Sequence, residues 1–317
     1  MSNGNNQNNS ALFTAEDRRH FLGGSDAGVI LGVNPYQSPY ELWRVKVGID
    51  QPFEGNTATA WGHYFEDLVA QAASDRLDVQ FRRANKRFVH PEHDFLVAHI
   101  DRMSRQADLL LECKTTTSRA ARSYGQDGLV ITNEESCVGV IPKSHYWQIQ
   151  QYLLLTGLGS AYLAVAILDD RDIRMYRVWP NLDDQERLVK ASKAFWQCVQ
   201  TTTPPTEMTS TDYDLMYPDS ESESTALCGE HDRRIIEEYN KLKGQEVEIA
   251  DQRKHLEAEI KSMIGECEVL QCGDEKLASW KSQTRESLDL KALKKDKPEL
   301  FDQYSKVSSF RVLRVSQ

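Results

Sequence analysis

The sequence lacks any apolar run long enough to cross a bilayer, and its first residues lack the apolar centre of a signal peptide. Its six cysteines, at positions 113, 137, 198, 228, 267 and 272, form no Cys-x-x-Cys pair and no zinc-type spacing. Scattered cysteines of this kind are typical of reduced thiols and exclude a cysteine-bound iron–sulfur cluster. We therefore predict a cytoplasmic protein with no membrane-spanning segment.

An excess of basic residues is also missing, because the formal net charge of the 317-residue chain is −10. This balance argues against tight, metal-independent binding of DNA. The charge is unevenly spread, and residues 204–227 hold six acidic side chains and no basic one. Basic residues gather at Arg18, Arg19, Arg82, Arg83, Lys86, Arg87, Arg102, Arg105, Lys114, Arg119 and Arg122. Local patches determine phosphate affinity, so the composition still permits a nucleic-acid substrate.

The composition changes along the chain and predicts four parts. Residues 1–12 are rich in Asn and poor in apolar side chains, which is typical of a disordered tail. Residues 13–203 alternate helical and strand-like patterns, which favours one mixed α/β (α+β) domain. Residues 204–227, rich in Pro, Ser, Thr, Asp and Glu, indicate an acidic linker, and residues 228–317 form a separate C-terminal helical and β-hairpin module.

Within residues 13–203 the apolar spacing predicts a central sheet flanked by helices. Helices are expected from a cap at Thr14, from Ser25 or Asp26 to Leu31, from Ser38 to about Val47, and over 58–77, 144–156 and 183–200. Strands are expected over 86–90, 95–100, 107–113, 161–169 and 172–180, with the last at an exposed edge. Residues 115–117 should leave the sheet, and residues 125–142 should form a loop or mobile flap.

The C-terminal module carries a coiled-coil-like seam. Its apolar positions follow a 4-3-7-7-4-3 spacing at Ile235, Tyr239, Leu242, Ile249, Leu256, Ile260 and Met263. Two intervening seam positions, Glu246 and Arg253, are charged, and Gly244 interrupts the run. We therefore expect this helix to pack on its own small domain or to bend into a hairpin. A β-hairpin is expected over 266–282 and a last strand over 307–315.

The run VAHIDRMSRQADLLLECKTTT contains the most informative pattern in the chain. Side chains alternate along a strand, so Glu112 and Lys114 share one face while Cys113 points to the other. If the two apolar stretches of this run pair as a hairpin, Asp101 joins that face. Carboxylate oxygens suit Mg²⁺ or Mn²⁺, and a lysine beside the metal can orient or deprotonate a water. Such a group is suited to metal-assisted phosphodiester hydrolysis, although similar carboxylates also occur as solvated surface residues.

Four motifs in order resemble the phage lambda exonuclease family, also called YqaJ-type viral recombinases. They are GGSDAGVILGVNPYQSPYELW, WGHYFEDLV, the Asp…Glu-x-Lys run HID…LECKTTT, and IPKSHYWQIQQYLLLTG, and the resemblance covers roughly residues 14–200. The resemblance implies a restriction-endonuclease-like core of the PD-(D/E)xK superfamily, with a central mixed β-sheet flanked by helices. It also implies an Mg²⁺-dependent nuclease, with Mn²⁺ possible and two ions expected.

The resemblance also implies roles for individual residues. Glu66, Asp101, Glu112 and the backbone carbonyl of Cys113 would bind metal, Glu66 either directly or through water. Lys114 would position the attacking water, and Gln148 would hydrogen-bond near the scissile phosphate or that water. Gln151 is the alternative to Gln148 on the same helix. Tyr152, one turn from Gln148, either contacts DNA or packs in the core.

A pocket for the 5′-phosphate of a DNA end is implied by Arg18 and Ser25, since a guanidinium and a hydroxyl suit a terminal phosphate. Arg19 could take the place of Arg18, and Ser25 could equally be a plain helix cap. His99 stands where some relatives place a serine, and it either donates to a phosphate or is buried and hydrogen-bonded. Tyr36 and Tyr40 could wedge the duplex end, whereas Trp43, Trp61 and Trp147 are expected in the core.

The activity that this family implies is 5′-to-3′ digestion of linear double-stranded DNA ends, which leaves 3′ single-stranded overhangs for phage-type recombination. Relatives form trimeric rings and act with a single-strand annealing protein, so a homo-oligomer in the cytoplasm of a phage or prophage host is expected. The C-terminal module is a candidate docking element or a stabilising appendage. Two alternatives remain: a structure-specific or single-strand nuclease of the same superfamily, and a non-catalytic DNA-end or partner-binding module.

Overall fold

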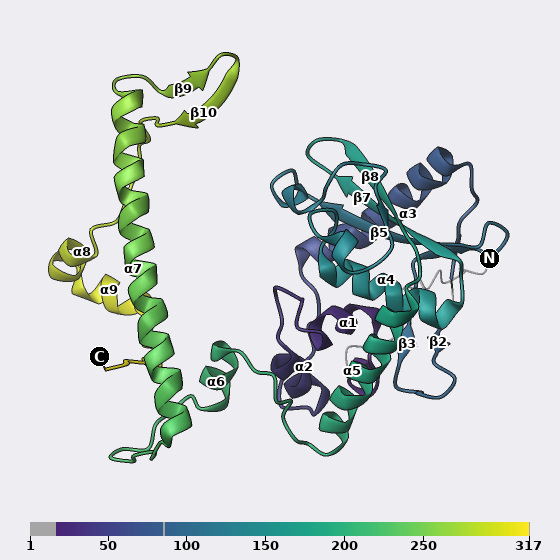
Figure 1. Cartoon of the computed structure of the whole chain (residues 1–317), viewed down its shortest axis with the longest axis horizontal. Coiled ribbons are helices and arrows are strands. Elements are labelled where there is room, and N and C mark those ends of the chain that lie inside the picture. Colours follow the sequence, from purple (N-terminus) through teal and green to yellow (C-terminus); the bar gives the residue numbers. More distant parts are fainter. Residues whose placement is uncertain (1–16, 85, 317) are drawn as a thin grey trace, which may run out of the picture. The chain divides into compact units, whose positions relative to one another are not determined.

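The chain divides into two compact units, one ending at Tyr213 and one beginning at Asp214, in a computed structural model that describes residues 17–84 and 86–316 (Figure 1). The expectations for residues 1–12 and for a cap at Thr14 lie outside the described residues. Within 204–227, residues Ser210–Met216 form helix α6. Asp212 of α6 is fully buried and accepts a hydrogen bond from Ser38 Oγ at 2.5 Å, so part of the acidic stretch packs on the first unit.

A six-stranded mixed sheet forms the centre of the first unit, in the order β1-β4-β5-β7-β8-β6. The strands are β1 (Arg82–Arg83), β4 (Arg102–Ser104), β5 (Leu109–Thr116), β7 (Ser160–Ile167), β8 (Asp172–Val178) and β6 (Val130–Ile131). Strand β5 runs parallel to β7 and antiparallel to β4, and β8 runs antiparallel to β7. The predicted mixed α/β fold with a central mixed sheet is confirmed.

Helices cover both faces of this sheet. Helix α3 (Thr57–Leu77) packs Val69, Ala70 and Ala73 on one face, where Leu111, Ala164 and Met175 point. Helices α1 (Gly24–Ile30) and α4 (Lys143–Thr156) cover the other face, where Leu110, Leu163 and Val165 point. Because strand side chains alternate, every even-numbered residue of β5 faces α4 and every odd-numbered one faces α3.

The helix ends follow from local capping chemistry. Ser38 caps α2 (Pro39–Lys46) by accepting a hydrogen bond from the Glu41 backbone at 3.0 Å, as predicted. Gly157, with φ of +67°, ends α4 in the left-handed region that favours glycine. Asn181 caps α5 (Leu182–Gln200). The prediction that Ser25 or Asp26 caps α1 is wrong, because the cap position is Gly23, whose N–H donates to the Asp26 carboxylate at 2.9 Å.

Three sequence predictions about strands need correction. The partner of Leu109–Leu111 is β4, after Asp101, whereas β3 (Val97–Ala98) pairs with β2 (Phe88–Val89) in a separate sheet. The sequence of β4 shows no apolar strand pattern because one of its buried residues is Arg102. Ion pairing with Glu66, and not an apolar side chain, allows this burial. Strand β5 continues to Thr116, whereas residues 115–117 were expected to leave the sheet. Strand β8, expected at an exposed edge, lies inside the sheet because β6 pairs with it on the outer side.

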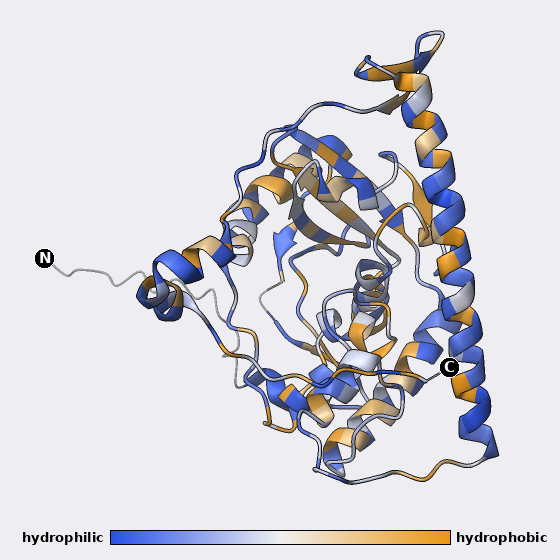
Figure 2. Ribbon diagram, turned by 90° about the vertical axis from the view of Figure 1, so that its left-hand side faces the viewer, coloured by the Kyte–Doolittle hydropathy of each residue, from blue (hydrophilic) through white to orange (hydrophobic). Residues whose placement is uncertain are grey.

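The second unit consists of one long helix and small elements beside it. Helix α7 (Glu230–Ile264) is continuous, so the predicted bend into a hairpin does not occur, and apolar turns recur along it (Figure 2). Strands β9 (Val269–Cys272) and β10 (Glu275–Ser279) form the predicted hairpin. Helices α8 (Leu290–Asp296) and α9 (Pro298–Tyr304) follow. The strand expected over 307–315 is absent, because β9 and β10 pair only with each other and the segment stays exposed.

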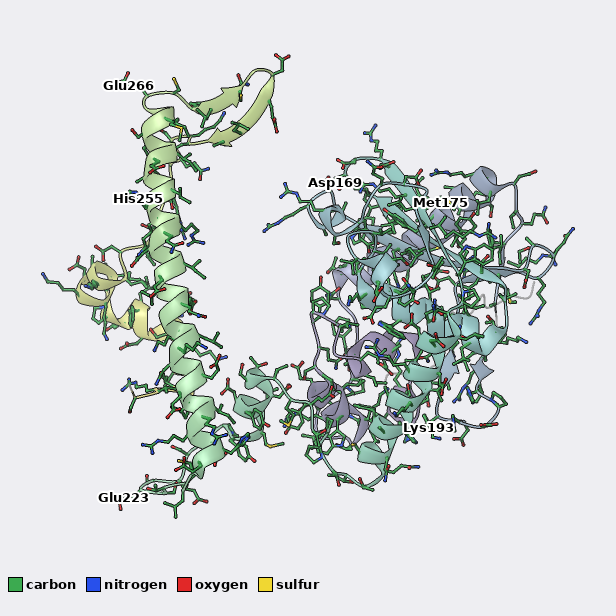
Figure 3. The ribbon with its side chains drawn as sticks, viewed as in Figure 1. Asp169, Met175, Lys193, Glu223, His255 and Glu266 are labelled. Atoms are coloured by element: carbon green, nitrogen blue, oxygen red, sulfur yellow. The ribbon has the colours of Figure 1, made fainter. Side chains whose placement is uncertain are left out.

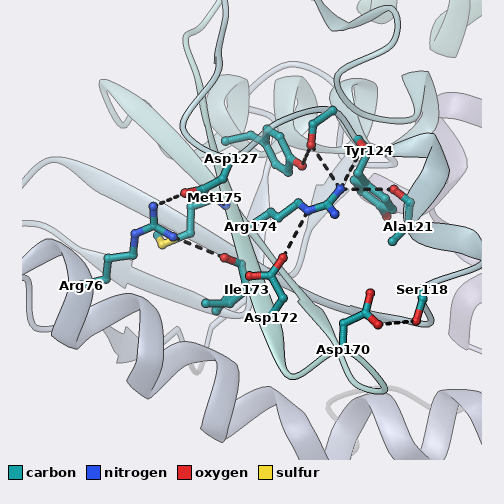
Figure 4. A network of polar contacts seen from close by, with 12 residues as sticks. Arg76, Ser118, Ala121, Tyr124, Asp127, Asp170, Asp172, Ile173, Arg174 and Met175 are labelled. Carbon is teal, nitrogen blue, oxygen red and sulfur yellow. Dashed lines mark hydrogen bonds and ion pairs between the residues drawn. The ribbon is translucent and has the colours of Figure 1, made fainter. Parts of the chain in front are cut away.

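The segment between β5 and α4 is anchored to the sheet, and it contains residues 125–142, which were expected to form a loop or mobile flap. It includes η2 (Ala120–Ser123) and η3 (Glu135–Cys137) besides β6. Its first residues reach the β7–β8 turn, where the Ser118 N–H donates to Asp169 at 2.7 Å. Further along, Asp127 accepts a hydrogen bond from the N–H of Met175 at 2.7 Å, and Figure 3 labels both Asp169 and Met175. Arg174 of β8 donates to the carbonyls of Ala121, Tyr124 and Gly125, as Figure 4 shows.

The close approach of α1 to α4 generates the first testable prediction. A Cβ on Gly28 would lie 2.8 Å from the Ser144 backbone, so Gly28→Ala forces the two helices apart and should destabilise the first unit by about 1–3 kcal/mol. Thermal and urea unfolding measure this. Gly62→Ala, in the interior of α3 with its nearest neighbour at 3.8 Å, is the matched control and should be neutral or stabilising. Equal stability of the two variants would contradict the tight helix contact.

Candidate functional site

Asp101 and Glu112 meet across adjacent strands. The register pairs Arg102 with Leu111, so one further step places Asp101 opposite Glu112, on the face that α4 covers. The Asp101 carboxylate accepts a hydrogen bond from the Cys113 N–H at 2.9 Å, which fixes its position just before the start of β4. The expected juxtaposition of Asp101 with Glu112 therefore occurs, but it comes from the hairpin of β4 and β5 and not from the apolar stretch before Asp101, which pairs with β2.

Glu112 is the centre of the hydrogen bonding at this site. Its side chain is 3% exposed, and Oε1 accepts hydrogen bonds from Lys114 Nζ at 2.6 Å and from Gln148 Nε2 at 2.8 Å. Gln148 Nε2 also contacts Tyr152 Oη at 2.7 Å. Within the described part of the chain, Oε2 of Glu112 is buried with no hydrogen-bond partner. A buried carboxylate oxygen without a partner is unfavourable, and a bound cation would satisfy it.

The electrostatics of the site favour a cation. Burial raises the pKa of Asp101 well above its ordinary value, and repulsion from Glu112 raises it further. Burial lowers the pKa of Lys114, but attraction to Glu112 and Asp101 outweighs this and the pKa of Lys114 is raised overall. The lysine therefore stays charged. Two buried carboxylates of like charge provide hard oxygen donors, and this donor chemistry fits Mg²⁺ or Mn²⁺.

The thiol of Cys113 and its backbone N–H lie on different sides of β5. Its thiol packs on the α3 face, as predicted, and burial raises the pKa of that thiol, so it remains protonated. The N–H and C=O of one residue in a strand point to the same side of the strand. Because the Cys113 N–H donates toward Asp101, its carbonyl faces the same side of β5, opposite the residues that precede β4.

Glu66, expected to help bind the metal directly or through water, is held by an arginine in this structure. It lies on α3, on the opposite face of the sheet, and its carboxylate forms an ion pair with the buried Arg102. Arg102 also pairs with Asp67, which accepts a second hydrogen bond from Arg83 at 2.7 Å. Glu66 is close enough to contribute to the raised pKa of Asp101. Among the described residues, no group of three or more His, Cys, Asp or Glu side chains is arranged to hold a metal ion.

The two glutamines of α4 have different contacts. Gln148 donates to Glu112, whereas Gln151 is fully buried and donates to the carbonyls of Leu22 at 3.1 Å and Val97 at 2.9 Å. Gln151 therefore joins α4 to the segment before α1 and to β3. Of the two candidates in the sequence, Gln148 is the one beside the carboxylates. Tyr152 is buried, which agrees with core packing, but its hydroxyl still reaches Gln148.

Helix α1 begins beside these residues. A Cβ on Gly24 would lie 2.2 Å from the Tyr152 ring, so only glycine permits this approach. Lys46 of α2 is buried and donates to the carbonyls of Arg18 and Phe21 and to the Asp26 carboxylate, at 2.6–2.8 Å. This lysine holds the segment from η1 (Asp17–His20) to the start of α1 in place. Ser25, in the first turn of α1, is exposed.

His99 and Arg18 lie near one another on this side of the unit. The His99 ring stacks on Phe21 with a centroid distance of 6.4 Å, and Arg87 lies over the Phe21 ring at 5.1 Å. Burial lowers the pKa of His99, and the positive charges of Arg87 and Arg18 lower it further. Arg19 instead donates to Gln51 at 2.9 Å and to the Asp50 carbonyl. Arg18 is exposed and available to a ligand, as is Tyr36, whereas Tyr40 is buried.

Two residues near Lys114, Tyr124 and His145, were not identified as site residues from the sequence. Tyr124 Oη lies 3.1 Å from His145 Nδ1, and burial raises the pKa of Tyr124 to about 12. Burial and the charge of Lys114 lower the pKa of His145 to about 3, so this imidazole is neutral near pH 7. His145 stands inside the motif IPKSHYWQIQQ, where its position before Gln148 was a usable signal. Tyr124 lies in the connecting segment and carried no such signal.

Comparisons with known proteins identify the class first. Residues 15–159 match the model of the YqaJ-like viral recombinase domain. The chain is also 30% identical over 307 residues to the uncharacterized protein YqaJ of Bacillus subtilis strain 168, and the match covers 93% of this chain and 91% of that protein. The chain therefore belongs to the YqaJ-like viral recombinase family.

Solved structures with similar folds are more distant. An alkaline exonuclease (LHK-Exo) from Laribacter hongkongensis is 14% identical, with a TM-score of 0.47 over 59% of this chain and 92% of that one. A phage-related exonuclease from Haemophilus somnus 129PT is 13% identical, with a TM-score of 0.43 over 58% of this chain and 96% of that one. In both cases the match covers less of this chain than of the solved protein.

The raised pKa of Asp101 makes a prediction about stability. A carboxyl whose pKa is raised by folding stabilises the folded state below its ordinary pKa of 3.8, and this contribution is lost as pH rises through the raised value. Asp101→Asn stays neutral and keeps a hydrogen-bond acceptor. In EDTA the variant should therefore unfold about 2–5 °C higher than the parent near pH 8, with a smaller difference near pH 5. Calorimetry at both pH values measures this, and a lower unfolding temperature for the variant at pH 8 would contradict the assignment.

Proposed function

We propose that this protein is a metal-dependent nuclease that digests linear double-stranded DNA from its 5′ ends. The observation that carries the proposal is the juxtaposition of Asp101 and Glu112 on adjacent strands, with Lys114 bonded to Glu112 at 2.6 Å. The family membership supports it, because the matching domain is that of viral recombinases. A buried pair of carboxylates beside a charged lysine is a strong candidate for hydrolysis of a phosphodiester.

Asp101, Glu112 and the Cys113 carbonyl would hold the metal, and we propose two Mg²⁺ ions, with Mn²⁺ able to replace them. Glu66 would act through water, or by orienting Arg102, because its carboxylate already binds that guanidinium. Bound ions would polarise the scissile phosphate and lower the pKa of the attacking water. Oε2 of Glu112 has no hydrogen-bond partner among the described residues, which supports this ligand set, since a cation would satisfy it.

The chain's own residues would orient the reacting groups. Lys114 would donate a hydrogen bond to the attacking water and stabilise the negative charge that develops on the phosphate. Gln148 would place an amide donor near the same phosphate, and Tyr152 would fix the orientation of that amide through its contact at 2.7 Å. Tyr124 and His145 would border the lysine, where the neutral imidazole adds no second positive charge beside Lys114.

Selection of the 5′ end would fall to Arg18, Ser25 and His99. Arg18 and Ser25 are exposed, and Lys46 holds the backbone between them. A 5′-phosphate bound there would place the adjoining strand near Glu112, because α1 packs on Tyr152. The product would be a duplex with 3′ overhangs, and an annealing protein would act on the exposed strand. Action in the cytoplasm of a phage or prophage host, and a trimeric ring, are further parts of the proposal that rest on the family resemblance.

One experiment separates this function from its two alternatives. Linear duplex DNA, end-labelled and either 5′-phosphorylated or not, is followed over time with Mg²⁺ and compared with circular duplex and with single strands. Progressive digestion of the linear duplex from its 5′ ends supports the proposal. Cleavage of circles or of branched or single-stranded DNA favours the structure-specific alternative. Binding of DNA ends without any cleavage that EDTA can suppress favours the non-catalytic alternative.

Substitutions at the centre of the site should abolish cleavage without unfolding the protein. Lys114→Ala and Asp101→Asn should each lower the rate about 100-fold or more, because each removes a group needed in the transition state. The matched control is Cys113→Ala, which lies between the site residues but points its side chain to the α3 face and should retain activity. Circular dichroism checks folding. A normal rate for Lys114→Ala on linear duplex would make this assignment wrong.

Arg18→Ala should reduce the preference for 5′-phosphorylated ends about tenfold, more than it reduces cleavage of 5′-hydroxyl ends. The reason is that a guanidinium stabilises a terminal phosphate dianion through charge-assisted hydrogen bonds. Arg19→Ala is the control, because Arg19 already donates to Gln51 and to the Asp50 carbonyl. The ratio of initial rates on the two substrates measures the effect. An unchanged ratio in Arg18→Ala, or an equal fall in both variants, removes the role.

A further inference from the structure

Helix α7 carries a complete heptad seam that is exposed to solvent. Positions alternate by four and three residues from Ile235 to Met263, which spans about 42 Å of helix at 1.5 Å per residue. Seven of the nine positions are apolar, and their exposed fractions run from 39% to 64%: Ile235, Tyr239, Leu242, Ile249, Leu256, Ile260 and Met263. A regular stripe of this length is stabilised by burial against another helix with the same repeat.

Apart from Glu246 and Arg253, the charged groups of α7 lie outside the seam, and several of them form pairs along the helix. Lys261 binds Glu257 at 2.6 Å, and His255, labelled in Figure 3, lies 3.5 Å from Glu259. These pairs keep the remaining surface of α7 soluble and leave the apolar stripe as its distinctive feature. The two charged seam positions, Glu246 and Arg253, are both exposed.

We propose that the α7 seam binds α7 of a second copy of this chain in antiparallel orientation. The charges on the seam select this occupant. In a parallel, in-register pair, Glu246 faces Glu246 and Arg253 faces Arg253, so two like-charged contacts lie inside the interface. The seam runs from Ile235 to Met263 and its midpoint is Ile249. In an antiparallel pair centred near Ile249, each a position of the heptad packs against a d position of the partner, which puts Glu246 of one copy one layer away from Arg253 of the other, within reach of both long side chains.

Two symmetric Glu–Arg contacts thus replace two repulsive ones, and this difference specifies direction in coiled coils. The two charged residues that argued against a parallel zipper in the sequence become the register signal of the antiparallel pair. The interface uses no residue of the proposed nuclease site. Whether two copies associate through α7 can therefore be measured independently of DNA cleavage.

Charge reversal in the full-length protein tests the proposal. Glu246→Arg and Arg253→Glu each create two like-charged contacts, so each should raise the dissociation constant in sedimentation equilibrium about tenfold or more. The double variant E246R/R253E restores both opposite-charge contacts and should bind within about threefold of the parent. Glu248→Arg, with the same charge change on an exposed position outside the seam, is the control and should have no effect. A monomeric parent chain, or a double variant as weak as the single ones, overturns the proposal.

A photo-crosslink gives the orientation directly. Tyr239→p-benzoylphenylalanine in the full-length chain should crosslink to residues 256–263 in a product of dimer mass. Within one helix, positions 239 and 260 are about 30 Å apart, so such a crosslink joins two copies. Crosslinks to residues 235–242 of the second copy would show a parallel pair. Crosslinks to residues 17–213 would show that the seam packs on the chain's own first unit, and either result overturns the proposal.

Discussion

The contact between Glu112 and Lys114 is the interaction on which the site depends. Both side chains leave the same face of β5, and the salt bridge keeps a lysine charged beside a buried carboxylate. Glu112 also receives Gln148, so one carboxylate joins the sheet to α4. Its second oxygen has no partner among the described residues, and Asp101 across the strands adds negative charge. The fold therefore concentrates unfavourable charge at one point, which is how proteins prepare a position for a cation.

Close packing of two glycines brings the start of α1, with Ser25 of the proposed phosphate pocket, next to α4 and Glu112. Gly24 and Gly28 allow α1 to lie directly against Tyr152 and Ser144 of α4. Lys46 then satisfies three acceptors of the segment before and within α1, which would otherwise be buried without partners. A motif that reads as a loop followed by a short helix thus acquires a fixed position relative to Glu112. The spacing of GGSDAG in the sequence reflects this contact as much as any contact with a ligand.

Much of this arrangement was predictable from the sequence, and the failures have physical reasons. The strict alternation of a strand placed Glu112 and Lys114 together, and the Ser38 and Gly157 caps predicted their helix ends. Strand β4 was missed because a buried arginine looks polar in a pattern search, although ion pairing to Glu66 and Asp67 allows its burial. The same long-range pairing holds the carboxylate of Glu66 against Arg102, which its place on α3 in the sequence did not indicate. Tyr124, the neighbour of His145, lies in a segment whose backbone carbonyls bind Arg174, and contacts of that kind leave no sequence signature.

In the second unit the long helix α7 was predicted from its apolar spacing, but the way in which it packs was not. A heptad with two charges at seam positions indicated an imperfect zipper, which led to the expectation of a hairpin or a small domain. That inference considered one copy of the chain in isolation. Charges at seam positions are unfavourable only when like faces like, and reversing the direction of the partner changes the sign of each contact. An exposed seam together with self-complementary charges therefore specifies both the kind of partner and its direction, which neither feature does by itself.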